Sequence, residues 1–211
     1  MYKRRMAFVA GMVALVLIAP ASQSAEAESA TEKPEPARFI EGLASEALKV
    51  LTASRGTLAE REDTFRRLLR DDFAMEKIGR FVIGPHWRTM TPQQQSQYQK
   101  LFAEWVLKTY SARLGGYSGE EFAVLRTSPA GRRDVIVHTK IIKPDAGNGL
   151  SVDWRVRKLD KKFRIIDIYV EGVSMAVTQR SEFDSVVRRH GVDGLISIIR
   201  ERLASLDTAN S

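Results

Sequence analysis

The feature that most constrains the fold is a change in the spacing of apolar residues at Gly115-Gly116. Before these glycines, apolar residues recur every three or four positions, as they do along one face of a helix. After them, apolar and polar residues alternate, as they do along a strand with one buried face. Helical spacing returns after Gly172. The pattern therefore predicts helices, then a sheet, then helices, in one α+β domain.

Four helices are expected before the change in spacing. Thr91 and Pro92 begin the longest of them, with Thr91 as the N-cap, Pro92 at the first helical position and Gln94 completing a capping box. Gly84-Pro85 stops the helix before it. The three shorter helices are expected over residues 39–55, 58–69 and 75–82.

Four strands are expected next, joined by short turns. In the third, Val152, Trp154 and Val156 alternate with charged residues, so one face is apolar. Sequential strands with short connections predict a curved antiparallel four-stranded sheet that N- and C-terminal helices cover around an apolar cavity. The C-terminal helices are separated by Gly191, and Asp193 is expected to cap the last. The strands are expected over residues 122–125, 134–142, 150–158 and 163–170.

The first residues have the features of an export signal. Lys3, Arg4 and Arg5 precede an apolar run over residues 6–19 that is too short to span a membrane. We therefore expect a cleaved signal peptide over residues 1–25, with the cut between positions 21 and 27, and a soluble mature product.

The rest of the chain is expected to divide into three parts. Residues 26–37 lack large apolar side chains and contain two prolines, which predicts a flexible leader. Residues 38–206 are about the size of one domain and form the single folded unit. Residues 207–211 are a short tail.

Composition excludes several classes of function. The chain has no cysteine, which excludes disulfides, thiol catalysis and cysteine-based metal sites. Removing the three basic residues of the export signal from the 33 in the chain leaves 30 against 26 acidic residues. So small a positive balance does not favour nucleic acid as a partner. No histidine spacing suits a metal, so no metal site is expected. No other cofactor is expected either.

One pair of residues is compatible with an enzyme. His138 and Asp167 both lie in the middle of expected strands, and small α+β enzymes can use an Asp and a His as base and acid. However, His138 shares its strand face with Lys140, while Val135 and Val137 lie on the more apolar face. We therefore expect no catalytic residues. A small periplasmic enzyme stays open as an alternative, as does an envelope adaptor that binds no cargo.

Two segments resemble the motifs of a known family. The first is Phe81-Val82-Ile83-Gly84 followed by Trp87-Arg88, just before the longest expected helix. The second covers residues 163–183, where an apolar strand ends at Glu171-Gly172 and passes directly into a segment with Arg180-Ser181. With these segments the chain resembles the MlaC (toluene-tolerance) family of periplasmic lipid carriers.

The resemblance extends over residues 39–206 and implies a function. Members are expected to be soluble periplasmic shuttles between an inner-membrane ABC transporter bearing an MCE-domain protein and an outer-membrane lipoprotein–porin complex. Asp153-Trp154-Arg155 stands where phospholipid-carrying members often have a tyrosine-rich strand, which favours the hopanoid-associated HpnM branch. The implied cargo is a membrane lipid, either phospholipid or hopanoid, and nucleic acid is not an expected partner.

A lipid carrier needs a dry interior, because each methylene exposed to water costs about 0.8 kcal/mol. We expect the apolar face of the sheet and its covering helices to form this interior. Gly172 would let the chain turn from sheet to helix, and Glu171 and Arg180 are expected to brace that corner. The candidate lipid-binding residues are Val135, Val137, Val152, Trp154, Val156, Ile166, Ile168 and Val170 from the strands, with Phe102 and Val106 from the longest helix.

Overall fold

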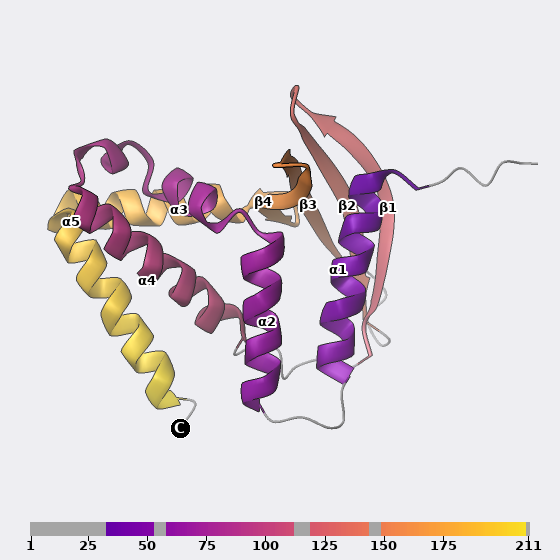
Figure 1. Ribbon diagram of the computed structural model, residues 1–211, viewed down its shortest axis with the longest axis horizontal. Coiled ribbons are helices and arrows are strands. Elements are labelled where there is room, and N and C mark those ends of the chain that lie inside the picture. The colour runs from indigo at the N-terminus through magenta and orange to yellow at the C-terminus, as the bar shows by residue number, and fades with distance from the viewer. Residues whose placement is uncertain (1–32, 53–57, 112–118, 144–148, 210–211) are drawn as a thin grey trace, which may run out of the picture. The chain divides into compact units, whose positions relative to one another are not determined.

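The computed structural model describes residues 33–52, 58–111, 119–143 and 149–209, all within the unit Lys33–Ser211. These residues form an α+β fold (Figure 1). The helices are α1 (Glu35–Thr52), α2 (Leu58–Asp72), α3 (Met75–Ile83), the 3-10 helix η1 (Gly84–Thr89), α4 (Pro92–Ser111) and α5 (Met175–Ala209). The strands are β1 (Glu121–Ala130), β2 (Asp134–Ile142), β3 (Leu150–Leu159), β4 (Lys162–Val170) and β5 (Val173–Ser174).

Both ends of the folded unit extend beyond the expected boundaries. Helix α1 begins at Glu35, inside the expected leader, and Ala37 is only 2% exposed. A proline is well tolerated in the first turn of a helix, so Pro36 does not prevent α1 from starting there. Helix α5 continues to Ala209, inside the expected tail. The expected signal peptide and the glycine pair at 115–116 lie outside the described residues.

The strands form one antiparallel sheet in the order β1-β2-β3-β4-β5, which confirms the expected meander. The short fifth strand was not expected, because only Val173 and Ser174 pair with β4 after the turn at Glu171-Gly172. Strand β1 is also longer than expected. It contains a bulge at Leu125, which interrupts the alternation of apolar residues along the strand.

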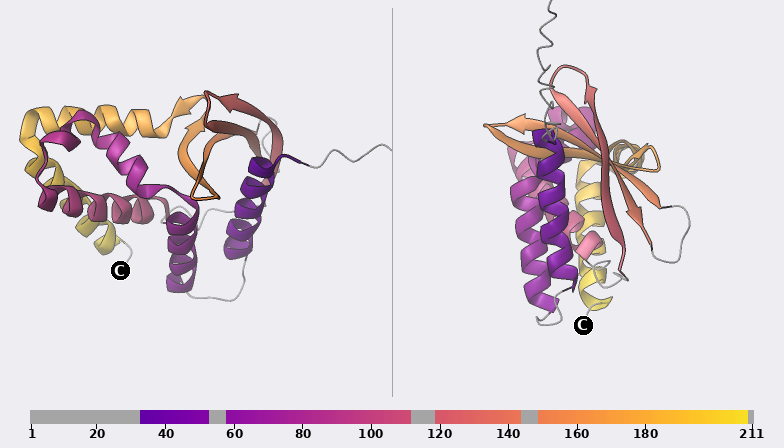
Figure 2. Two further views of the ribbon diagram at one scale, coloured as in Figure 1. Left: turned by 45° about the horizontal axis from the view of Figure 1, so that its top comes forward. Right: turned by 90° about the vertical axis from the view of Figure 1, so that its right-hand side faces the viewer.

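One apolar core lies between the sheet and α1, which Figure 2 shows running along the face of the sheet. Its centre consists of Ile40 from α1 with Val137, Val156 and Ile165 from the strands, none of them more than 1% exposed. Phe39 of α1 also contacts Phe163 of β4, with 6.1 Å between the ring centres. We name this cluster the sheet core.

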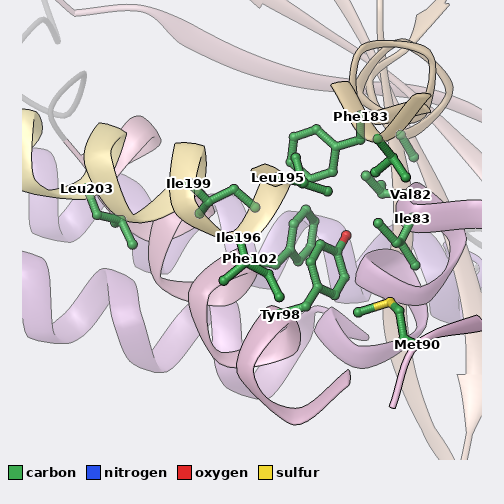
Figure 3. Close-up of a cluster of buried hydrophobic side chains, with 12 residues drawn as sticks. Val82, Ile83, Met90, Tyr98, Phe102, Phe183, Leu195, Ile196, Ile199 and Leu203 are labelled. Carbon is green, nitrogen blue, oxygen red and sulfur yellow. The ribbon is translucent and has the colours of Figure 1, made fainter. Parts of the chain in front are cut away.

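A second core is formed by α3, η1, α4 and α5 (Figure 3). Tyr98 and Phe102 of α4 pack their rings around Phe183 of α5, with ring centres 6.3 Å from it in both cases. Helix α3 approaches α4 closely at Gly79, where a Cβ would lie 2.9 Å from the Phe102 ring. The Tyr98 hydroxyl donates to the Gly79 carbonyl at 2.9 Å. We name this cluster the helical core.

The start of α4 confirms the expected capping box. The Gln94 N–H donates to Thr91 Oγ1 at 3.2 Å, and the Thr91 N–H donates to Gln94 Oε1 at 2.9 Å. The Gln94 amide also donates to Asp193 Oδ1 at 2.8 Å, which joins α4 to α5. Asp193 therefore accepts from another helix at the point where a cap was expected. Gly191, at φ 70°, makes the expected break in α5.

Candidate functional site

A cleft of about 810 Å³ opens between α2, the start of α3, α4 and the turn that joins β3 to β4. Leu69 of α2 and Leu107 of α4 are the most buried of its apolar residues, with exposures of 7% and 4%. This volume lies within the range of roughly 300–1,000 Å³ that is common for small-molecule pockets. The apolar lining consists of Leu69, Phe73, Ala74, Met75, Ala103, Leu107 and Leu159.

The cleft lies where the two cores meet. Phe73, which lines it, also packs against the sheet core, and Met75, which lines it too, packs against the helical core. Phe73 forms a parallel bridge with Ile165 of β4, and the Ala74 N–H donates to the Ile165 carbonyl at 2.9 Å. The α2–α3 junction therefore joins the two cores, and it forms part of the wall of the cleft.

The mouth of the cleft is rich in positive charge. Lys77 and Lys100 are exposed, and neither forms an ion pair with another residue that the structure describes. Arg66 and Arg70 are also exposed, and their nearest carboxylates lie on the same helix, at 4.0 and 3.4 Å. The charged lining residues are Arg66, Arg70, Lys77, Lys100 and Arg164, against Glu76, Glu104 and Asp160. The cleft thus combines an apolar interior with a net positive rim.

Arg164 of β4 has a mainly structural role at this rim. Its guanidinium donates to the carbonyl of Arg70 at 3.0 Å and to the carbonyl of Asp71, both in the last turn of α2. A positive side chain is favourable there because the carbonyl end of a helix carries partial negative charge. Burial raises the pKa of the neighbouring Asp72, while the Arg164 charge acts in the opposite direction. Arg164 therefore fixes the end of α2 to the sheet.

The structure places the ten candidate lipid-binding residues in three groups. Strand register puts seven of them on the face of the sheet that α1 covers: Val135, Val137, Val152, Trp154, Val156, Ile168 and Val170. Ile166 has no register partner, because a bulge lets Val156 pair with Ile165 instead. Phe102 and Val106 belong to the helical core.

None of the ten lines the cleft of 810 Å³, nor a smaller one of about 390 Å³ between α1 and β1. Sequence reasoning missed the α2–α3 junction because Phe73 and Ala74 fall between the expected helices 58–69 and 75–82, where apolar spacing gives little information. The available signal was three consecutive residues without charge after an acidic pair, Asp71-Asp72.

The possible enzymatic pair is not formed. His138 Nδ1 lies 2.9 Å from Asp153 Oδ2, and its Nε2 lies 2.8 Å from Ser128 Oγ, while Asp167 is engaged elsewhere. Ser128, His138 and Asp153 do form a hydrogen-bonded chain across β1, β2 and β3. However, none of the three lines either cleft, so neither cleft would hold a substrate next to the serine.

Asp167 instead fixes the start of α5. Its Oδ1 accepts the N–H groups of Ile168 at 2.8 Å and Ala176 at 3.1 Å, and its Oδ2 accepts the Ser174 hydroxyl at 2.6 Å. The side chain is buried, with the residue 8% exposed. A carboxylate at a helix N-terminus satisfies N–H groups that have no partner within the helix. Asp167 thus stabilises the connection between the sheet and the start of α5.

Replacing Asp167 by Ala is expected to lower the free energy of unfolding by about 2 kcal/mol, because buried N–H groups lose a charged acceptor. Asp167→Asn should cost less, since its amide oxygen can still accept from both N–H groups. Urea unfolding of the two variants measures the difference. Equal stability of wild type and Asp167→Ala would contradict this role.

The corner after β4 is braced by one of the two expected residues. Glu171 and Gly172 adopt positive φ angles of 48° and 78°, and Glu171 Oε1 accepts the Ser151 N–H at 2.6 Å. Gly172 thus makes the expected turn. Arg180 instead reaches α3, where its guanidinium lies 5.2 Å from the centre of the Phe81 ring.

Comparison with known proteins assigns the family. Residues 41–201 match the model of the MlaC protein family. A Haemophilus influenzae protein, the intermembrane phospholipid transport system binding protein MlaC, is 19% identical over 82% of this chain and 84% of its own length. Among the described residues, no helix combines the length and apolar character that a membrane span requires.

A solved structure has the same fold. It is a phospholipid-binding protein from Ralstonia solanacearum in complex with a phospholipid, with a TM-score of 0.69 and 22% identity, over 81% of this chain and 98% of that one. Neither relative is described as a hopanoid carrier. On the family match, this chain belongs to the MlaC family, which consists of lipid carriers and not of enzymes.

Proposed function

We propose that this protein binds phospholipid and carries it between membranes, with the acyl chains held in the cleft between α2, α3 and α4. The observation that carries the proposal is an apolar cleft of about 810 Å³ at the junction of two cores. A lipid chain gains about 0.8 kcal/mol for each methylene that leaves water, so even part of a chain supplies substantial affinity. The names of both relatives, which refer to phospholipid, support this cargo.

The candidate residues on the sheet would form the deeper part of the same site. Phe73 lies between the cleft and the sheet core, since it lines the first and packs against the second. Displacement of this ring would open the cleft toward the sheet core, against which Trp154 and Ile168 also pack. The tails of a longer lipid would then extend along that face, and the cleft would hold the part nearest the head group.

Hopanoid is the second candidate cargo, and the observation that favours it is Trp154. Its indole N–H donates to Thr139 Oγ1 at 3.1 Å, which fixes a wide flat ring on the apolar face of the sheet. A flat ring suits a rigid polycyclic hydrocarbon. The charged rim of the cleft favours phospholipid, because a phosphate gains from cations that an uncharged head group does not use.

The location and the partners are part of the proposal. The expected export signal and the family both support a periplasmic carrier. Such a carrier would exchange lipid with an inner-membrane ABC transporter that contains an MCE-domain protein and with an outer-membrane lipoprotein–porin complex. It needs only to match the affinity of a bilayer, because tighter binding would prevent release.

The test is to purify the protein without added lipid, extract it with organic solvent and identify the extract by mass spectrometry. The proposal predicts stoichiometric phospholipid. Hopanoid in the extract would support the role of a lipid carrier but show that the cargo is hopanoid instead of phospholipid. A protein that is purified without lipid and also takes up no phospholipid from vesicles would contradict the proposal. The remaining candidates would then be an envelope adaptor without cargo and a small periplasmic enzyme.

A further inference from the structure

The proposed function leaves open which phospholipids the protein prefers, and the rim of the cleft bears on this. Its basic side chains come from α2, α3, α4 and β4, so they approach the mouth from several directions. Of the acidic side chains in the lining, Glu104 is already paired, since it lies 3.8 Å from Lys108 on its own helix. Glu76 and Asp160 remain, and the five basic side chains still exceed them.

Lys77 and Lys100 are the rim cations best placed to meet a ligand. Arg164 already donates to the end of α2, and Arg66 and Arg70 each lie near a carboxylate of their own helix. Lys77 and Lys100 have no such partner among the residues that the structure describes. Both ammonium groups therefore keep their full hydrogen-bonding capacity for an anion at the mouth.

We propose that Lys77 and Lys100 make the cleft select phospholipids whose head group carries net negative charge over those whose head group is neutral overall. This inference rests on the proposed function. With the tails in the cleft, the phosphate lies at the rim, and a zwitterionic head group brings a cation next to the two lysines. An anionic head group brings none. The preference comes from this difference in repulsion, since both lipids present the same phosphate.

The experiment offers the protein mixed vesicles that contain equal amounts of phosphatidylglycerol and phosphatidylcholine with the same acyl chains. Native mass spectrometry then gives the ratio of the two lipids bound. Because both lipids come from one vesicle, attraction of the protein to its surface affects both equally. Exposed ion pairs are worth up to about 1 kcal/mol, which corresponds to a phosphatidylglycerol preference of about fivefold at low salt. The preference should shrink as salt is added.

The decisive variant is Lys77→Glu/Lys100→Glu, which should bring the bound ratio to one or below. Its matched control is Arg132→Glu/Arg133→Glu, which makes the same change in net charge at exposed positions of the β1–β2 turn, outside both clefts. The control should keep the preference of the wild type. Should the charge reversal impair folding, Lys77→Gln/Lys100→Gln serves instead and should lose the preference without reversing it.

Three results would overturn the inference. They are a wild-type ratio equal to that of the vesicle, an unchanged ratio in the lysine variant, and loss of preference when glycerol phosphate replaces chloride at constant ionic strength. The last would show a site for a soluble anion. In all three the protein still binds lipid, so the proposed function stands. A wild type that takes up neither lipid would remove both.

Discussion

Replacing Ala103 by Trp is expected to lower the amount of bound phospholipid at least tenfold while the protein stays folded. Ala103 lines the cleft from α4, so an indole at this position projects into a cavity of about 810 Å³ instead of a packed core. Displacing even a few methylenes, at about 0.8 kcal/mol each, exceeds the 1.4 kcal/mol that corresponds to a factor of about ten. Lipid extraction and mass spectrometry measure the loss.

Ala204→Trp is the matched control, because Ala204 is exposed on α5 and lines neither cleft. Both variants should keep the far-UV circular dichroism of the wild type. Ala103→Trp should be at least as resistant to heat as the empty wild-type protein, since it fills an apolar void. If Ala103→Trp binds as much lipid as Ala204→Trp, the tails occupy another part of the molecule.

The order of elements was predictable because local spacing determines it. Thr91, Pro92 and Gln94 form a signal that depends only on neighbours in the sequence, and it correctly predicted the start of α4. The alternation in β3 correctly predicted which residues share a face, since Val152, Trp154 and Val156 all point to one side. The exposed turn at Asp160, between β3 and β4, was predictable for the same reason, because turn formation depends mainly on local residue types.

The location of the cleft depends on contacts between distant residues. Phe102 and Val106 have the spacing of a buried helix stripe, and this spacing is the same whether the helix covers a sheet or other helices. The structure puts α3 and α5 against that stripe and leaves the sheet to α1. In β4, the bulge moves Ile166 out of register, and nothing in an alternating run of apolar residues marks such a position.

The second large effect concerns stability. Asp134→Ala is expected to lower the free energy of unfolding by about 3 kcal/mol, because it leaves two partly buried arginines without their shared partner. Asp134 accepts from Arg155 Nε at 2.8 Å and from Arg157 Nε and Nη2 at 2.5 and 2.8 Å. Its side chain is 2% exposed, against 36% and 23% for the arginines. For a domain of this size, the melting temperature should fall by about 6–12 °C.

Asp63→Ala is the control, since Asp63 lies 4.0 Å from Arg66 and its side chain is 80% exposed. Exposed pairs of this kind contribute little, so this variant should melt within about 1–2 °C of the wild type. Differential scanning calorimetry of the three proteins gives the comparison. A loss below about 1 kcal/mol for Asp134→Ala would mean that water replaces the carboxylate easily at this end of β2.

The dependence of this effect on pH identifies its cause. Hydrogen bonds from Arg157 and then Arg155 hold the pKa of Asp134 below its ordinary value of 3.8, although burial acts in the opposite direction. A carboxyl group whose pKa is lower in the folded state stabilises the fold fully above its unfolded pKa, and this contribution disappears as pH falls through the folded pKa. The stability difference between wild type and Asp134→Ala should therefore be constant near neutral pH and narrow below about pH 4. A difference that stays constant down to about pH 2 would show that the shape of the side chain, and not its charge, stabilises this part of the sheet.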